Sequence, residues 1–455
     1  MIIQESVNKL RSGYQSGINR SYESRKSHLL QLRELVVNHE TQLCDAIKKD
    51  FNKPFNEAFI TEVFTVLSEI DIHLKNLKKW MSPERVGTSI TTFPSKNRIY
   101  KQPYGTVCVI GAWNYPLHLS LMPLIGAISA GNTVVLKPSE LAPHTSALLS
   151  KLLNDTFDSS FLTVIEGGVP ETELLLKQKL DKIFFTGSTR VGKIIMKAAS
   201  ENLTPVTLEL GGKSPAIIHH DANLSVAAKR IWWGKVINAG QTCVAPDYVV
   251  VHESVADSFI EESKKVLSDF FQNDFIIGEN YSSIINKTHY KRLVDLLKKS
   301  KILHGGSMND DTLFIEPTLI DAQWDDKIME DEIFGPLMPI ITYQSEKECI
   351  HQLKQVGKPL ALYLFTENAS FESDVINSVP FGGGCINETI THLSNHHLPF
   401  GGVGESGMGS YHGLFSFETF SRKQGILKKG TWPDPDFRYP PYDSKLINWL
   451  KRYIK

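Results

Sequence analysis

Apolar and polar residues follow two different periods along the chain. Over residues 24–49 and 57–80, apolar side chains recur every three or four positions, with charged side chains between them. This period places the apolar side chains on one face of a helix. The pattern predicts two long amphipathic helices in the first part of the chain.

The helical period stops after Pro83. The segment 83–103 is mostly polar, and its apolar residues alternate with polar ones, which is typical of extended structure. We therefore expect an extended arm here, beside a domain boundary. A second segment without a regular pattern, 431–445, is rich in proline and aromatic residues and is expected to lie across a surface.

Two series of short apolar runs follow the arm, and helical stretches separate the runs. The first series covers residues 106–112, 132–138, 162–168 and 182–188, and the second covers 214–220, 247–253, 338–344 and 361–367. This alternation is typical of β-α-β units, in which helices cover a parallel sheet. Because there are two series, we expect an α/β protein with two sheets.

Length and charge limit the classes of partner. The chain has 455 residues, enough for about two or three domains with a sizeable core. It carries 49 Lys and Arg against 50 Asp and Glu. A formal charge of -1 provides no general attraction to nucleic acid or to anionic membranes, so we expect neither as a partner.

The cysteines and the apolar stretches indicate a cytoplasmic protein. The five cysteines are scattered and form no C-x-x-C pair, so we expect reduced thiols and no zinc site. Glu5 precedes any apolar stretch, which argues against a secretory signal. The longest apolar stretch, 117–130, is shorter than the roughly 20 residues of a membrane span. We expect a soluble, unprocessed chain.

Two segments carry candidate ligand-binding residues. Gly187 and Gly192 lie where a predicted strand meets a predicted helix, and main-chain N–H groups at such a helix start favour a phosphate. Their spacing is neither G-x-G-x-x-G nor a Walker loop, and a tight turn explains it equally well. Lys137 and Glu140 follow another apolar strand, at the edge where α/β sheets bind ligands, although each alone also fits a solvated loop.

Three residues have the chemistry of a catalytic site. Cys243 lies in a polar, glycine-containing segment that is typical of an accessible thiol, whereas most cysteines are small buried residues. Glu209 precedes two glycines and can act as a general base, or simply end a strand at the surface. Asn114 follows a strand and offers an amide donor to an oxyanion, or is a turn residue before proline.

The motifs around these residues make the chain recognisable. It resembles the aldehyde dehydrogenase superfamily from end to end, and most closely the class 3 branch of fatty and aromatic aldehyde dehydrogenases. The resemblance is carried, in the order of the family, by PYGTVCVIGAWNYP, GNTVVLKPSE, FFTGSTRVGK, TLELGGKSP, NAGQTCVAPDY, MEDEIFGP, KPLALYLFT and HLPFGGVGESGMGSYHG. One departure is Asp331, where the family often has Glu.

The resemblance implies a role for each candidate residue. Cys243 would be the nucleophile, Glu209 the general base and Asn114 the oxyanion donor. The implied cofactor is NAD, with NADP possible as a second choice. Its site would comprise Lys137 and Glu140 at the adenosine ribose, Gly187 and Ser188 along the pyrophosphate, Glu332 at the nicotinamide ribose, and Phe334 beside the nicotinamide. Trp113 and Gly192 are also expected to bind the cofactor.

The resemblance also implies the architecture. We expect a Rossmann-type cofactor domain at 1–82 and 104–211, and an α/β catalytic domain at 212–411. The segments 83–103 and 412–455 would form a small β arm that joins two chains into a homodimer, because strand-like segments outside the α/β rhythm need a partner.

The expected reaction is oxidation of an apolar aliphatic or aromatic aldehyde to the carboxylic acid. A tunnel for such a substrate would be lined by Trp113, Tyr115, Leu117, Leu119, Trp232 and Trp233. Two alternatives remain open from the sequence. One is a dehydrogenase for a charged semialdehyde, which needs a cationic side chain at the tunnel mouth. The other is a catalytically silent relative with a structural role.

Overall fold

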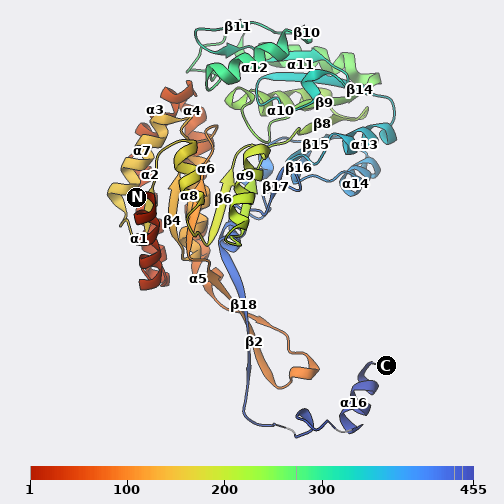
Figure 1. Cartoon of the computed structure of the whole chain (residues 1–455). Helices are drawn as coiled ribbons and strands as arrows, with labels where there is room; N and C mark the ends of the chain where they lie inside the picture. The colour runs from red at the N-terminus through yellow and green to blue at the C-terminus, as the bar shows by residue number, and fades with distance from the viewer. Residues whose placement is uncertain (1, 273, 435, 443, 455) are drawn as a thin grey trace.

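Two helix-covered sheets form the body of the molecule, and a thin arm extends from it (Figure 1). This computed structural model describes residues 2–272, 274–434, 436–442 and 444–454. The two sheets correspond to the two series of apolar runs, so the α/β class predicted from the sequence is confirmed.

The first sheet has six strands in the order β17-β7-β6-β3-β4-β5. Its strands are β3 (Thr106–Ile110), β4 (Thr133–Lys137), β5 (Leu162–Val164), β6 (Lys182–Thr186), β7 (Val206–Glu209) and β17 (Gly407–Met408). All neighbours are parallel except β17 and β7. Each run of the first predicted series contains one of the strands β3 to β6. Their side chains are almost all buried, as expected for parallel strands covered on both faces.

The second sheet has seven strands in the order β10-β13-β14-β9-β8-β15-β16. Its strands are β8 (Pro215–Ile218), β9 (Tyr248–His252), β10 (Lys301–His304), β13 (Thr318–Asp321), β14 (Leu337–Tyr343), β15 (Ala361–Phe365) and β16 (Gly383–Ile386). The four predicted runs form its centre, β14-β9-β8-β15. A separate small hairpin joins β11 (Met308–Asn309) to β12 (Phe314–Ile315).

Helices pack on both sheets. They are α1 (Ile2–Ser16), α6 (His118–Ala130), α7 (Pro143–Thr156), α8 (Val169–Leu176), α9 (Thr189–Ser200), α10 (Leu224–Val236), α11 (Ala256–Phe271), α12 (Lys287–Leu297), α13 (Glu346–Gln355), α14 (Ala369–Ser378) and α15 (Leu414–Thr419). Helix α6 contains the longest apolar stretch and is almost wholly buried. At Gly126 it lies so close to α15 that an added Cβ would be 2.9 Å from Ser416 Cβ. Among the described residues, no helix is long and apolar enough to cross a membrane.

The two predicted N-terminal helices are each interrupted. The first divides at His39 into α2 (Tyr22–Asn38) and α3 (Glu40–Phe51), because His39 leaves the helical region and its Nδ1 bonds back to the Leu35 carbonyl at 2.9 Å. The second begins with α4 (Phe55–Ala58) and one π-helical turn, η1 (Phe59–Val63), before α5 (Phe64–Met81). The π turn precedes the cavity described below.

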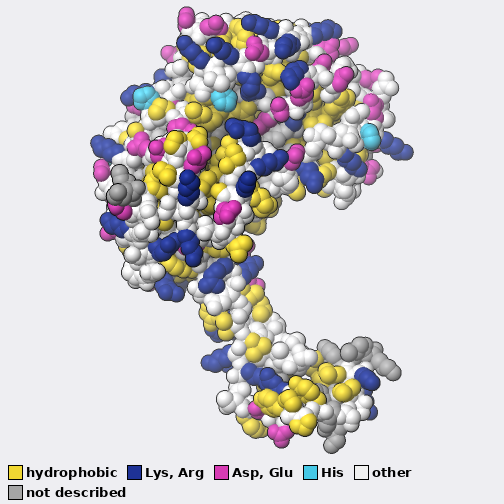
Figure 2. Space-filling model, in the orientation of Figure 1, with side chains coloured by type: hydrophobic (Ala, Val, Ile, Leu, Met, Phe, Trp, Pro, Cys, Tyr) yellow, Lys and Arg dark blue, Asp and Glu magenta, His cyan; other side chains and the backbone are white. Residues whose placement is uncertain are grey.

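The arm brings together two segments that are distant in sequence. Strands β1 (Glu84–Val86), β2 (Ser95–Pro103) and β18 (Ser421–Lys429) form an antiparallel sheet, in which Ser421 pairs with Pro103 and Lys429 with Ser95. The predicted extended arm is therefore present. Apolar side chains gather on the arm and tail in Figure 2, and Phe93 is 73% exposed.

The tail beyond the arm differs from expectation. It contains a short 3₁₀ turn, η7 (Asp436–Arg438), and a helix, α16 (Ser444–Ile454), that was not predicted. Figure 1 shows α16 far from both sheets. The expectation that 431–445 lies across a surface is therefore not met within one chain: Trp432 in this segment is 85% exposed.

Candidate active site

The loop that carries Cys243 is shaped by two left-handed residues. After α10, Asn238 and Ala239 have φ values of 56° and 50°, which turn the chain sharply within η3 (Ile237–Gly240). The Asn238 amide stabilises the turn by donating to the carbonyls of Asn114, at 2.8 Å, and Gln241, at 3.0 Å. An asparagine tolerates this backbone better than most side chains do. The turn places Cys243 beside the end of β3.

Asn114 and Tyr115 bind this loop from the side of the first sheet. Asn114 follows β3, is 3% exposed, and donates from Nδ2 to the Gln241 carbonyl at 3.0 Å. The hydroxyls of Tyr115 and Thr242 are 2.7 Å apart. The two predicted catalytic segments, which are more than 120 residues apart in sequence, therefore meet directly.

Cys243 lies at the wall of a cavity, as its sequence context predicts. Its side chain is half-buried, whereas Cys44, Cys108 and Cys349 are buried. Burial, and next the charges of Glu332 and Glu209, raise the pKa of the Cys243 thiol to about 12. The main-chain N–H groups of residues 243 and 244 act in the opposite direction. Those N–H groups are therefore close enough to stabilise negative charge beside the sulfur.

Glu209 is the last residue of β7 and is 3% exposed. Neither of its carboxylate oxygens has a hydrogen-bond partner within the described part of the chain. Burial raises the pKa of this carboxyl well above its usual value. A carboxylate in this setting is a strong acceptor for a proton of water, which is what a general base requires. The alternative of a surface residue is excluded.

Lys137 and Glu140 form an ion pair at the carboxyl edge of the first sheet. Lys137 ends β4 and is buried, and its Nζ is 3.0 Å from Glu140 Oε2 and 3.2 Å from the Pro138 carbonyl. Glu140 remains 43% exposed. The lysine is therefore not a solvated loop residue, and the carboxylate is available to a ligand at this edge.

The glycine turn lies where the sequence places it. Gly187 follows β6, and Ser188 is the N-cap of α9, with its hydroxyl accepting from the Val191 N–H at 3.4 Å. Both glycines also have packing roles. An added Cβ would lie 2.5 Å from the Phe185 ring at Gly187 and 2.8 Å from Leu210 Cδ2 at Gly192. The turn leaves the free N–H groups of α9 at the sheet edge.

Glu332 and Phe334 approach the same edge from the second sheet. An added Cβ at Gly211 would overlap the Glu332 carboxylate, so the glycine after β7 makes this approach possible. Burial, and next Asp247, raise the pKa of Glu332 to about 8, while a Gly212 hydrogen bond opposes the shift. Phe334 packs edge-on against Trp113, with ring centroids 5.4 Å apart.

A buried lysine that the sequence analysis did not single out positions this segment. Lys213 Nζ binds Asp247 at 2.7 Å and the carbonyls of Ile328 and Asp331 at 2.9 and 3.0 Å. Both carbonyls belong to the segment just before Glu332, so these bonds fix the chain that leads into Glu332. The available signal was the position of Lys213, directly after the two glycines that follow Glu209.

The cavity in front of Cys243 has a volume of about 280 Å³. It is lined by Ile60, Thr61, Phe64, Thr65, Ser68, Tyr115, His118, Leu119, Met122, Trp233, Ile237, Thr242, Cys243, Val244, Ile390, Leu393, Ser394, His396, Phe400, Tyr411 and His412. Of the six predicted lining residues, Tyr115, Leu119 and Trp233 are present. The other three are a correction: Leu117 and Trp232 are core residues, and Trp113 packs on Phe334.

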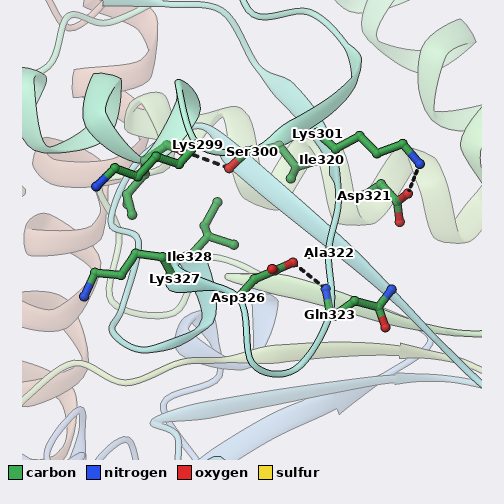
Figure 3. Close-up of a pocket in the computed structure, with 11 residues that line it drawn as sticks. Lys299, Ser300, Lys301, Ile320, Asp321, Ala322, Gln323, Asp326, Lys327 and Ile328 are labelled. Carbon is green, nitrogen blue, oxygen red and sulfur yellow. Dashed lines mark hydrogen bonds and ion pairs between the residues drawn. The ribbon is translucent and has the colours of Figure 1, made fainter.

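A second cavity, of about 250 Å³, lies beside β13 and the end of α12. Figure 3 shows that its polar side chains include Lys299, Lys301 and Asp326. Lys301 turns toward Asp321, with which it forms an exposed ion pair at 2.6 Å. None of the predicted site residues lines this cavity. The candidate active site is therefore the cavity that ends at Cys243.

Comparison with known proteins identifies the family. The sequence profile of the aldehyde dehydrogenase family matches residues 3–426. The chain belongs to the aldehyde dehydrogenase family. Members of this family are oxidoreductases that use NAD or NADP. The resemblance recognised in the sequence, and the fold class that it implied, are confirmed.

The similarity to individual relatives extends over nearly the whole of this chain. Aldehyde dehydrogenase family 3 member I1, chloroplastic, of Arabidopsis thaliana is 48% identical over 98% of this chain and 82% of its own length. The dimeric NADP-preferring aldehyde dehydrogenase of Canis lupus familiaris is 42% identical over 98% of this chain and 99% of its own. A solved structure, the substrate-bound state of Staphylococcus aureus AldH, is 45% identical, with a TM-score of 0.98 over 100% of both chains.

Proposed function

We propose that this chain oxidises an apolar aldehyde to the carboxylic acid, with Cys243 as nucleophile. The observation that carries the proposal is an apolar cavity that ends at a half-buried thiol, near a buried carboxylate that has no partner among the described residues. A thiolate attacks the aldehyde carbon and forms a thiohemiacetal. The proton of the thiol must leave first, and burial makes this step unfavourable until the site is assembled.

The oxyanion of the thiohemiacetal would be held by two donors. The Asn114 amide carries two protons, and only one is committed to the Gln241 carbonyl. The main-chain N–H of Cys243 lies beside its own sulfur. Donors fixed in advance stabilise the developing charge without reorganisation.

The residues around Lys137, Ser188 and Glu332 fit a dinucleotide. The ion pair at the β4 edge suits ribose hydroxyls, and the N-terminus of α9 suits a pyrophosphate. Glu332 is close enough to Cys243 to raise the pKa of its thiol, and we expect the nicotinamide near Glu332 and the Phe334–Trp113 contact. NAD or NADP, when bound there, supplies the hydride acceptor. A thioester on Cys243 is the product of that step.

Glu209 would complete the reaction by activating a water molecule against the thioester. Its carboxylate accepts a proton from water, and the hydroxide equivalent releases the acid and the Cys243 thiol. The electrostatic effect of Glu209 on the Cys243 pKa supports this role, because such an effect requires the two groups to lie near each other. We propose hydrolysis, rather than acyl transfer to another thiol, because this base is present.

The lining of the cavity favours an apolar substrate over a charged one. None of the described lining residues is Lys or Arg, which an anionic semialdehyde would need. The rim and wall are built from aliphatic and aromatic side chains such as Ile60, Phe64 and Trp233. The silent-relative alternative is disfavoured by the complete set of Cys243, Glu209 and Asn114.

We also propose that NAD is the preferred cofactor, with some use of NADP. We further propose that the protein is a homodimer in the cytoplasm. Glu140 can accept bonds from ribose hydroxyls and repels a 2′-phosphate. The relative from Canis lupus familiaris is named as NADP-preferring, so a preference for NADP also occurs within the family. The free thiols fit a reducing compartment.

The test is formation of NADH with a panel of aldehydes. The wild-type chain should oxidise aliphatic and aromatic aldehydes, and Cys243→Ala should form no acid but still bind NAD in calorimetry. Cys385→Ala is the matched control, because Cys385 is also half-buried but does not line the cavity, and it should stay active. Normal turnover by Cys243→Ala would contradict the proposal.

A further inference from the structure

His118 is one of three histidines, with His396 and His412, among the mainly apolar residues that line the cavity. It is the first residue of α6, and its position is fixed by Glu62, whose Oε2 accepts the N–H groups of Leu117 and His118 at 2.9 and 3.3 Å. Glu62 is fully buried and paired with Lys53 at 2.8 Å. The backbone that carries His118 is therefore held rigidly.

Hydrogen bonds decide which ring nitrogen of His118 carries the proton. Nδ1 is 2.9 Å from Thr65 Oγ1, and that oxygen is also 3.0 Å from the carbonyls of Thr61 and Glu62. Carbonyl oxygens only accept, so the single hydroxyl proton of Thr65 goes to the helix backbone. Thr65 then accepts from Nδ1–H, and Nε2 carries a lone pair. Burial lowers the pKa of His118 to about 3, so the ring stays neutral.

The Nε2 atom of His118 receives no hydrogen bond from any residue that the structure describes. It differs from Nε2 of His412, which also lacks a partner but is completely enclosed. His118 Nε2 therefore keeps surface that a molecule in the cavity can reach. Such an acceptor requires a donor when hydrocarbon displaces water from it.

The other imidazole groups of the cavity are committed. His396 bonds to Glu69 Oε2 at 2.9 Å and to the Ser68 hydroxyl at 3.4 Å. His412 donates from Nδ1 to the Leu393 carbonyl at 3.2 Å. His118 is thus the imidazole of this wall that a substrate can address.

We propose that His118 Nε2 is a specificity-determining acceptor for a hydroxyl group on the carbon chain of the aldehyde. The preferred substrates are then apolar aldehydes that carry one hydrogen-bond donor away from the carbonyl. This inference rests on the proposed oxidation of apolar aldehydes in the same cavity. An ether oxygen cannot replace the hydroxyl, because two acceptors would face each other.

The test compares linear aldehydes of one chain length that carry a hydroxyl, a methoxy or a methyl group at successive carbons. At the position that reaches Nε2, kcat/KM for the hydroxyl compound should exceed both others by about tenfold. His118→Leu should reduce this ratio to about one. His118→Gln, whose amide oxygen can accept, should restore part of it. Met122→Leu, at the same wall, should leave the ratio unchanged.

Binding of the same compounds to Cys243→Ala separates this inference from the proposed function. A tighter Kd for the hydroxyl compound that His118→Leu abolishes supports the inference even if the wild-type chain forms no acid. The absence of turnover by the wild-type chain then contradicts the proposed function alone. A hydroxyl-to-methyl ratio of one or less at every position overturns the inference. A ratio that His118→Leu leaves unchanged overturns it as well.

Discussion

The Asn114 amide donates a hydrogen bond to the main-chain carbonyl of Gln241, with 3.0 Å between the two atoms. This bond joins the loop after β3 to the loop that carries Cys243. One amide thus holds the nucleophile loop with one proton and keeps a second proton for the oxyanion. The bond links the loop after β3 of the first sheet to the loop between α10 and β9 of the second.

Asn114→Ala should lower kcat/KM for aldehyde oxidation by about 10²- to 10³-fold, the usual effect of removing one oxyanion donor. The Kd for NAD should stay nearly unchanged, because Lys137 and Ser188 are untouched. Steady-state kinetics and calorimetry measure the two quantities. A loss of less than about threefold in kcat/KM would show that Asn114 only shapes the loop.

Alkylation of Cys243 should report its raised pKa. Because burial and two carboxyls disfavour the thiolate, the rate of reaction with iodoacetamide should rise steadily from pH 7 to pH 10 without a plateau. The Cys385→Ala background removes the other half-buried thiol. A plateau below pH 8 would contradict the assigned pKa.

Glu332→Gln should change the rate of Cys243 alkylation only at high pH. The pKa of Glu332 is raised to about 8, so the carboxyl is neutral at pH 6 and charged at pH 9. Its charge raises the pKa of Cys243, and removing it should speed alkylation at pH 9 but not at pH 6. Equal rates of variant and parent at both values would exclude this coupling.

The sequence predicted the two sheets because their central strands are continuous apolar runs. It missed features whose causes are not local. The division of the first helix depends on one bond from His39, and the π turn precedes the cavity wall. Helix α16 is amphipathic, so its sequence did carry a helical period, which the prediction missed.

Within the candidate site, Asn114 bonds to the loop that carries Cys243, and Glu209 is close enough to affect the pKa of the Cys243 thiol. Their catalytic roles, which the family resemblance implied, stay predictions. The sequence could not distinguish lining from core among neighbouring aromatic residues: on α10, Trp232 is fully buried whereas Trp233 lines the cavity. It also gave no sign of the contacts that Lys213 makes across the site.

Glu140→Gln should raise the use of NADP relative to NAD. The Glu140 carboxylate would repel a 2′-phosphate, but it is 43% exposed and paired with Lys137. Screened repulsion of this kind is worth about 1 kcal/mol, so the ratio of kcat/KM values should change about five- to tenfold. Kinetics with both cofactors measure it. An unchanged ratio would mean that Glu140 does not face the ribose.

The exposed apolar residues of the arm and tail should lie in a dimer interface. Trp432→Glu, in the tail, should convert a dimer into a monomer in light scattering at micromolar concentration. Leu203→Glu is the matched control, because Leu203 is 90% exposed on the body of the chain, and this variant should remain dimeric. A monomeric wild-type chain would contradict the proposed assembly.

The most direct test of the mechanism is rapid mixing of Glu209→Gln with an aldehyde and NAD. Formation of the thioester needs Cys243 but not the base, whereas its hydrolysis needs Glu209. We predict a burst of NADH close to one equivalent per site, slow turnover afterwards, and an acyl adduct on the Cys243 peptide in quenched samples. Linear NADH formation without a burst, and no adduct on Cys243, would contradict the account.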